Sequence, residues 1–189
     1  MRTQSGAPRQ RFVAFLRAIN VGGHVVKMER LRTEFEAMGF REVETFIASG
    51  NVLFETASDE RAALELRIER RLEKTLGYPV ATFLRTPNEL DALVRYEPFP
   101  GRDETAARSV GFLKAELSRE LRDRLLAFRT DVDEFEARGR EAFWLCGTRT
   151  SDSRMTGAKM ERALAMRVTF RNVTTVRKLA RKMAGNAIA

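Results

Sequence analysis

The sequence has few of the residues that build covalent and metal-linked sites. Its 189 residues include one cysteine, Cys146, and one histidine, His24. A single cysteine excludes an intrachain disulfide and a Cys-based zinc site, and a single histidine excludes a His-rich metal site. We therefore expect no metal and no cofactor. Cys146 has apolar neighbours on a predicted strand, so we expect a core residue rather than a nucleophile.

Long apolar runs are also lacking. The longest run near the start, residues 12–19, is interrupted by Arg17 and is too short to span a bilayer. No small-residue cleavage site follows it, so we expect no signal peptide. Together with the lone cysteine, this predicts a cytoplasmic protein without a membrane partner. The polar stretch 1–10, which contains Gly6 and Pro8, is predicted to be a disordered lead-in.

Acidic residues are scarce in the last fifth of the chain. Residues 149–189 contain ten lysines and arginines but only two acids, Asp152 and Glu161. The rest of the chain has 24 basic and 24 acidic residues, so the whole net charge of +8 belongs to this segment. Such an imbalance is typical of a surface that meets a negatively charged partner.

The apolar pattern repeats one order of elements twice. In the first half, strands are predicted at 11–18, 43–48, 51–55 and 80–84, with helices that begin near Lys27, Ser58 and Pro87. In the second half, strands are predicted at 109–114, 132–137, 141–145 and 167–170, with helices at 118–128, 155–164 and 174–183. Ser58 and Ser118 are expected to cap the helices that begin beside them. The order β-α-β-β-α-β-α predicts an α+β fold of tandem ferredoxin-like halves, each followed by a helix.

The boundary between the halves is predicted in the Pro- and Gly-containing region 98–107. The first half then covers residues 11–97 and the second covers 108–189. The first strand is apolar on both faces, so we expect both faces to be covered. A covered sheet would not serve as an open platform for stacking RNA bases.

Three stretches carry a resemblance to a known family: FLRAINVGGH (15–24), TFIASGNVLFE (45–55) and TFRNVTTVRKLA (169–180). They resemble the bacterial family catalogued as domain of unknown function 1697, over residues 11–183. The resemblance implies an α+β, ferredoxin-like duplication, and it implies no activity, cofactor or catalytic residue. Family members tend to carry a short Arg-Ser-Lys-Leu-like run before the last helix. This chain reads SRMTGAK at 153–159, so no role for that loop is carried over.

The first candidate site is a corner between two loops of the first half. In a ferredoxin-like half, the loop after the first strand and the hairpin between the second and third strands lie at the same end of the sheet. Glycines and helix-start N–H groups suit a phosphate or carboxylate, although the spacing is not that of a P-loop. Alternatively, the glycines only permit tight turns and the asparagines tie the loops together. The corner residues are Asn20, Gly22, Gly23, His24, Lys27, Ser49, Gly50 and Asn51.

The second candidate site is the basic segment. On the last helix, Val176, Leu179 and Met183 form an apolar face, and the cations lie largely away from it. Such cations suit the phosphates of a nucleic acid or another polyanion. Alternatively, they form a solvated face that also favours the helix C-terminus. The candidate residues are Arg154, Lys159, Arg171, Asn172, Arg177, Lys178, Arg181 and Lys182.

Three functional hypotheses remain open on the sequence. The leading one is a cytoplasmic binding protein with a polyanion partner. The second is a small-molecule enzyme or sensor that holds an anion at the corner. The third is a protein whose paired halves form an interaction surface. No nucleophile and base pair is identifiable, so no catalytic residue is assigned, and the sequence does not indicate an oligomeric state.

Overall fold

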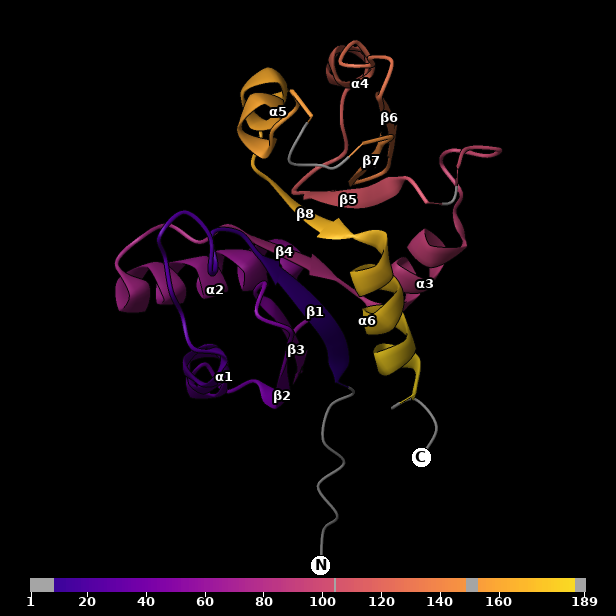
Figure 1. Ribbon diagram of the computed structural model, residues 1–189. Coiled ribbons are helices and arrows are strands. Elements are labelled where there is room, and N and C mark those ends of the chain that lie inside the picture. The colour runs from indigo at the N-terminus through magenta and orange to yellow at the C-terminus, as the bar shows by residue number, and fades with distance from the viewer. Residues whose placement is uncertain (1–8, 104, 149–152, 186–189) are drawn as a thin grey trace, which may run out of the picture. The chain divides into compact units, whose positions relative to one another are not determined.

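The computed structural model describes residues 9–103, 105–148 and 153–185 (Figure 1). The first half runs through β1 (Gln10–Leu16), α1 (Met28–Ala37), β2 (Arg41–Phe46), β3 (Asn51–Thr56), α2 (Arg61–Leu76), β4 (Thr82–Arg85) and α3 (Pro87–Arg95). The second half runs through β5 (Ala107–Leu113), α4 (Arg119–Leu126), β6 (Asp133–Arg138), β7 (Glu141–Cys146), α5 (Gly157–Leu164), β8 (Val168–Asn172) and α6 (Val173–Gly185). The predicted order of strands and helices is confirmed in both halves. Most of the predicted disordered lead-in, residues 1–8, lies outside the described residues.

The first unit contains a four-stranded sheet in the order β2-β3-β1-β4. Each neighbouring pair is antiparallel, and β1 is central, with Val13 opposite Leu53 on one side and Arg85 on the other. Helices α1 and α2 supply Phe35 and Ile68 to a core that covers one face of this sheet. That face is the one on which β1 places Phe12, Ala14 and Leu16. Their regular alternation follows from the two-residue repeat of a strand.

Strand β1 is buried on both of its faces. Phe12 and Ala14 on the helix-covered face are 1% and 0% exposed, and Val13 and Phe15 on the other face are 0% exposed. The expectation that both faces of this strand are covered is confirmed.

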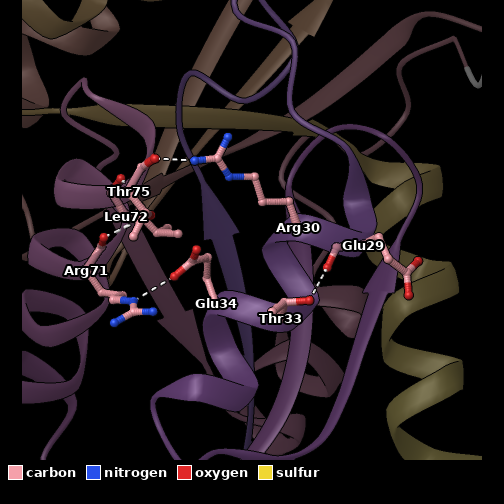
Figure 2. A network of polar contacts seen from close by, with 7 residues as sticks. All are labelled: Glu29, Arg30, Thr33, Glu34, Arg71, Leu72 and Thr75. Carbon is pink, nitrogen blue, oxygen red and sulfur yellow. Dashed lines mark hydrogen bonds and ion pairs between the residues drawn. The ribbon is translucent and has the colours of Figure 1, made fainter.

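A polar network joins α1 to α2 (Figure 2). Arg71 Nε lies 2.6 Å from Glu34 Oε2, and the Arg30 guanidinium donates to the carbonyl oxygen of Thr75. Within α1, Thr33 Oγ1 donates to Glu29 O at 3.0 Å. The Arg71 side chain is 39% exposed, and such a pair contributes about 1 kcal/mol or less. The network orients the two helices, and the apolar core supplies most of the stability.

The second unit contains a sheet in the order β6-β7-β5-β8, again antiparallel throughout. Helices α4 and α5 pack on the face that carries Trp144 and Cys146. Trp144 Nε1 donates to the buried carboxylate of Asp133 at 2.8 Å, which satisfies the indole in the core. The expectation that Cys146 is a core residue is confirmed, because its side chain is 1% exposed.

Helices α3 and α6 lie on the opposite face of the second sheet. Phe143 alternates with Trp144 on β7, so its ring points away from α4 and α5. It contacts Tyr96, just beyond α3, at a centroid distance of 5.2 Å. It also lines a cavity with Val110 of β5 and Val176 of α6. The second sheet is therefore covered by two helices on each face.

The compact units divide after Pro87, earlier than the predicted boundary at 98–107. Helix α3 belongs to the second unit because its contacts are made there. Arg140 lies 2.7 Å from Glu89 of α3, and the Arg138 guanidinium lies 4.6 Å from the centroid of the Tyr96 ring. Prolines and glycines mark where the chain turns, whereas a unit boundary depends on which side chains contact each other.

The helix caps are predicted correctly in one case and wrongly in another. Ser118 caps α4, where its Oγ accepts from Leu121 N at 3.3 Å. Ser58 does not cap α2, because that helix begins at Arg61, after Glu60, with no side-chain cap. Ser58 N instead donates to Thr56 Oγ1 at 3.2 Å. None of the helices within the described residues is long and apolar enough to cross a membrane.

Candidate functional site

The two loops of the predicted corner meet in the first unit. Leu16 N donates to Gly50 O at 2.8 Å, and Asn20 Nδ2 donates to Ala48 O at 2.8 Å. The hydrogen bonds join the end of β1 to the hairpin between β2 and β3. Their meeting follows from the sheet order, because β1 and β2 run in the same direction on either side of β3. The predicted convergence of the loops is confirmed.

The side chains of the two asparagines bind the loops themselves. Asn20 Oδ1 accepts from Val26 N at 2.7 Å, while its Nδ2 donates to Val26 O as well as to the hairpin. Asn51 is fully buried, and its Nδ2 donates to Phe46 O and Ser49 Oγ, each at 3.0 Å. These bonds match the structural interpretation of the asparagines, in which the amides close the loops.

The glycines of the corner differ in what they require. A Cβ on Gly50 would lie 2.8 Å from Ile19 Cβ, and Gly50 has a φ of +73°. This position therefore needs glycine for both space and conformation. Gly22 and Gly23 have φ values of +61° and +88°, but a Cβ on either would meet no atom within 4 Å. Both are exposed, so only the backbone conformation requires glycine there.

His24 and Lys27 lie at the exposed rim of the corner. The His24 ring stacks on Tyr78, with centroids 3.7 Å apart and planes 20° apart. Burial raises the pKa of Tyr78, an effect that the nearby Arg30 charge opposes, and the Tyr78 hydroxyl has no hydrogen-bond partner within the described residues. Lys27 is the extended N-cap residue that immediately precedes α1, close to the predicted start of this helix.

Exposed apolar residues at the corner were missed by the sequence reasoning. Val21, Val25 and Ile47 are 59%, 89% and 51% exposed. Ile47 also has a φ of +52°, which is rare for a β-branched residue. Asn20 has a positive φ as well, at +54°. The signal in the sequence was the placement of β-branched residues beside glycines and a hairpin turn. The positive φ values and the exposed apolar side chains indicate that the backbone of this corner is strained and that its surface is partly apolar.

On α6 the predicted facing of the cations is confirmed. Val176, Leu179 and Met183 are buried, while Arg177, Lys178 and Arg181 are exposed. The side chains of these three cations make no ion pair or hydrogen bond within the described residues. Helix α6 also contains no Asp or Glu, unlike α1 to α5. We call Arg177, Lys178 and Arg181 the α6 basic face.

Three other members of the predicted basic set do not belong to that face. Arg171 is only 7% exposed, and its Nη1 donates to Thr169 Oγ1 and to Phe170 O. Burial lowers the pKa of Arg171 to about 10. Arg171 faces inward because it pairs with Val110 on the central strand β5, which corrects its interpretation as a surface cation. Asn172 Oδ1 accepts from Thr174 N and so closes the first turn of α6, and Lys182 is half-buried.

The basic residues before α6 form a separate group. Arg154 and Lys159 lie at the start of α5, where Lys159 Nζ donates to Arg154 O at 2.5 Å. Because α5 and α6 cover opposite faces of the second sheet, these two cations do not extend the α6 basic face. Arg149 lies outside the described residues. The positive charges of the C-terminal segment thus lie in two separate groups, one at the start of α5 and one on α6.

Comparison with known proteins gives a family. The family model described as a protein of unknown function, DUF1697, matches residues 9–143. The chain belongs to this family. The matched residues end within β7, so α5, β8 and α6 lie beyond the match. No curated protein matches the chain.

A solved structure of a similar protein shows the same fold. The chain is similar to the conserved bacterial protein SP0830 from Streptococcus pneumoniae, with a TM-score of 0.70 and 23% sequence identity. The similarity covers 93% of this chain and 99% of the other. This member of DUF1697 therefore has a mixed α+β fold of two similar halves, each with a four-stranded antiparallel sheet.

The sequence reasoning also missed that two buried arginines occupy equivalent positions in the two halves. Arg85 of β4 is fully buried, and its Nη1 donates to Leu84 O at 2.8 Å. Arg85 pairs with Val13 on β1, as Arg171 pairs with Val110 on β5. The Thr-Phe pair before each arginine was the signal in the sequence. The two halves therefore share a buried cation as well as an order of elements.

Metal-binding clusters are not found among the described residues, where no group of three His, Cys, Asp or Glu side chains is placed to hold an ion. The two candidate sites that the sequence predicts, the rim of the corner and the α6 basic face, both have residues exposed to solvent. The α6 basic face consists of three cations that have no partner within the described residues.

Proposed function

We propose that the protein binds a polyanion, of which nucleic acid is the favoured class, through the α6 basic face. The observation that carries this proposal is a helix whose three exposed cations have no counter-charge within the described residues. The other helices contain acidic residues among their cations, some of them in ion pairs such as Arg32–Glu36 of α1 and Arg124–Glu120 of α4, whereas α6 contains none. An unpaired cation keeps its full attraction for phosphate.

The spacing of the α6 basic face suits successive phosphates. Arg177 and Arg181 are one helical turn apart, which is about 6 Å along the axis at 1.5 Å per residue. Lys178 lies beside them on the same exposed side. Three phosphate contacts would give a slope of log K against log salt of about −2.7 for duplex DNA, since each contact contributes about −0.9. Binding of this kind is weak, insensitive to sequence and strongly dependent on salt.

The test is a fluorescence-anisotropy titration of labelled duplex and single-stranded oligonucleotides at two salt concentrations. The variant is Arg177→Glu with Arg181→Glu. The matched control is Arg70→Glu with Lys74→Glu on α2, which has the same spacing, the same charge change and exposed side chains without a partner within the described residues. We expect the α6 variant to lose binding and the α2 control to keep most of it. No binding at low salt, or equal losses in both variants, would contradict the proposal.

A second candidate function is an anion-binding enzyme or sensor at the corner. It is favoured by one observation: α1 has no side-chain cap, and the neighbouring Gly22 and Gly23 are open to solvent. The start of a helix attracts anions. A thermal-shift screen of phosphates and carboxylates, repeated with His24→Ala and Asn51→Ala, tests this function. It is rejected if no anion raises the melting temperature of the wild type.

We further propose that the two halves are duplicated ferredoxin-like units in a cytoplasmic protein. The sheet orders β2-β3-β1-β4 and β6-β7-β5-β8 support the fold assignment. The buried free thiol of Cys146 is consistent with a reducing compartment. An experimental structure with another strand order would contradict the fold assignment, and recovery of the protein outside the cytoplasmic fraction of its host would contradict the location.

A further inference from the structure

A narrow cavity lies in the second unit between α3, α6 and the sheet. Its walls are largely apolar and include Leu93 of α3, Val110 of β5, Phe143 of β7 and Val176 of α6. The cavity volume is about 20 Å³. About one water-sized group fits, because one water needs about 10–15 Å³ by this measure. The cavity therefore suits a single small group and not a ring.

Two arginines line this cavity. Arg108 comes from β5 and Arg177 from the α6 basic face. The Arg108 Nε is buried without a hydrogen-bond partner within the described residues, while its Nη2 donates to Arg102 O at 3.2 Å. A buried N–H without a partner costs about 1–3 kcal/mol, so it indicates a missing acceptor. The Arg177 side chain likewise has no partner among the residues described.

One carboxylate also lines the cavity, but it does not neutralise the arginines. Glu97 Oε1 accepts from Phe99 N at 3.1 Å, and Glu97 forms no ion pair with Arg108 or Arg177. Two cations thus share a small, mostly apolar cavity without a paired acid. Low local polarity strengthens the attraction between such cations and an anion.

We propose that Arg108 and Arg177 bind one phosphate group, with an oxygen of that phosphate in the cavity and accepting from Arg108 Nε. Guanidinium groups suit this role because their planar N–H groups match the oxygens of a phosphate. The site anchors a phosphate of the polyanion at one end of the α6 basic face. The inference deepens the proposed function, on which it rests for the identity of the larger ligand.

Inorganic phosphate is the probe for the site itself. Its binding to the full chain is measured by ³¹P NMR titration at constant ionic strength, with chloride as the balancing anion. The variants are Arg177→Gln and Arg108→Gln, and the matched controls are Lys178→Gln and Arg181→Gln, which change the same helix outside the cavity. Arg177 is exposed, so its variant is expected to fold even where Arg108→Gln does not.

We expect Arg177→Gln to weaken phosphate binding about tenfold or more, the size associated with a lost charge-assisted hydrogen bond. Each control should weaken it about twofold or less, as expected for a screened surface charge. Equal losses in Arg177→Gln and Lys178→Gln would overturn the site. So would an absence of phosphate binding at low ionic strength.

Oligonucleotides with and without a 5′-phosphate separate two sources of the phosphate. A terminal phosphate is the source if the phosphorylated strand binds more tightly and Arg177→Gln removes the difference. Internal phosphates are the source if both strands bind equally and Arg177→Gln weakens both more than Lys178→Gln does. If nucleic acid binds while inorganic phosphate does not, the proposed function survives and the phosphate site is rejected.

Discussion

Substitution of Gly50 tests how strongly the corner depends on close approach of its two loops. In Gly50→Ala, the new Cβ would lie 2.8 Å from Ile19 Cβ and 2.9 Å from its Cγ1. The first of these contacts cannot be relieved by rotation about χ1, because Cβ is attached directly to the backbone. Ile19 is itself only 2% exposed, so the loop must move as a unit.

The expected destabilisation of Gly50→Ala has two parts. A left-handed conformation costs a residue with a Cβ about 1–2 kcal/mol. Overpacking of a buried site adds about 1–3 kcal/mol. Gly39→Ala supplies the matched control, because Gly39 has a φ of +79° but its Cβ would meet no atom within 4 Å. The control should show only the conformational part.

The assay is urea unfolding followed by far-UV circular dichroism for the wild type and both variants. We expect the free energy of unfolding of Gly50→Ala to fall by about 1–3 kcal/mol more than that of Gly39→Ala. A change in the midpoint without a change in the m-value would show that stability itself has changed. Equal decreases in the free energy of unfolding of the two variants would refute this reasoning, since they would show that Ile19 can move away from the new Cβ without loss of stability.

Three further perturbations test single contacts. Asn20→Ala removes the amide that joins both loops and should lower the free energy of unfolding by about 1–3 kcal/mol, measured by urea unfolding, whereas no loss would mean that the loops meet without it. Tyr78→Phe removes a hydroxyl without a partner, so stability at neutral pH should stay the same or rise. Because burial raises the pKa of Tyr78 above 10 in the folded protein, the contribution of the neutral phenol to the free energy of unfolding is complete below pH 10 and is lost as the pH rises through the folded pKa. Thermal melts between pH 9 and 12 should show this loss of stability for the wild type and not for Tyr78→Phe. The thiol of Cys146 should react with a thiol reagent only after denaturation, and rapid labelling of the native protein would contradict its burial.

The fold was accessible to sequence reasoning because its signals are local. Strand and helix periods appear in the spacing of apolar residues, as in Val176, Leu179 and Met183, which the structure buries. Ser118 is a cap that the sequence predicts, and its bond is present. The division of the compact units after Pro87 depends on contacts such as Arg140–Glu89, between residues 51 positions apart, so it has no local signal in the sequence.

The candidate sites were accessible in part. Convergence of the two loops follows from strand order, so Asn20 and Gly50 could be placed together. The direction of a side chain depends on its partners, so neither the stacking of His24 on Tyr78 nor the burial of Arg171 could be predicted. The cavity between Arg108 and Arg177 joins residues 69 positions apart and has no sequence signal.

The two similar halves and the location of the net charge in residues 149–189 can both be recognised in the amino-acid sequence. Both properties depend on residues that are close together in the chain, so they can be recognised without knowledge of the tertiary structure. Which of the cations are exposed to solvent depends on how the chain folds. The sheet turns Arg171 inward, the two faces of the sheet separate Arg154 from Arg177, and α6 presents three cations together. The reason is that exposure and pairing depend on packing between distant segments, which composition does not specify.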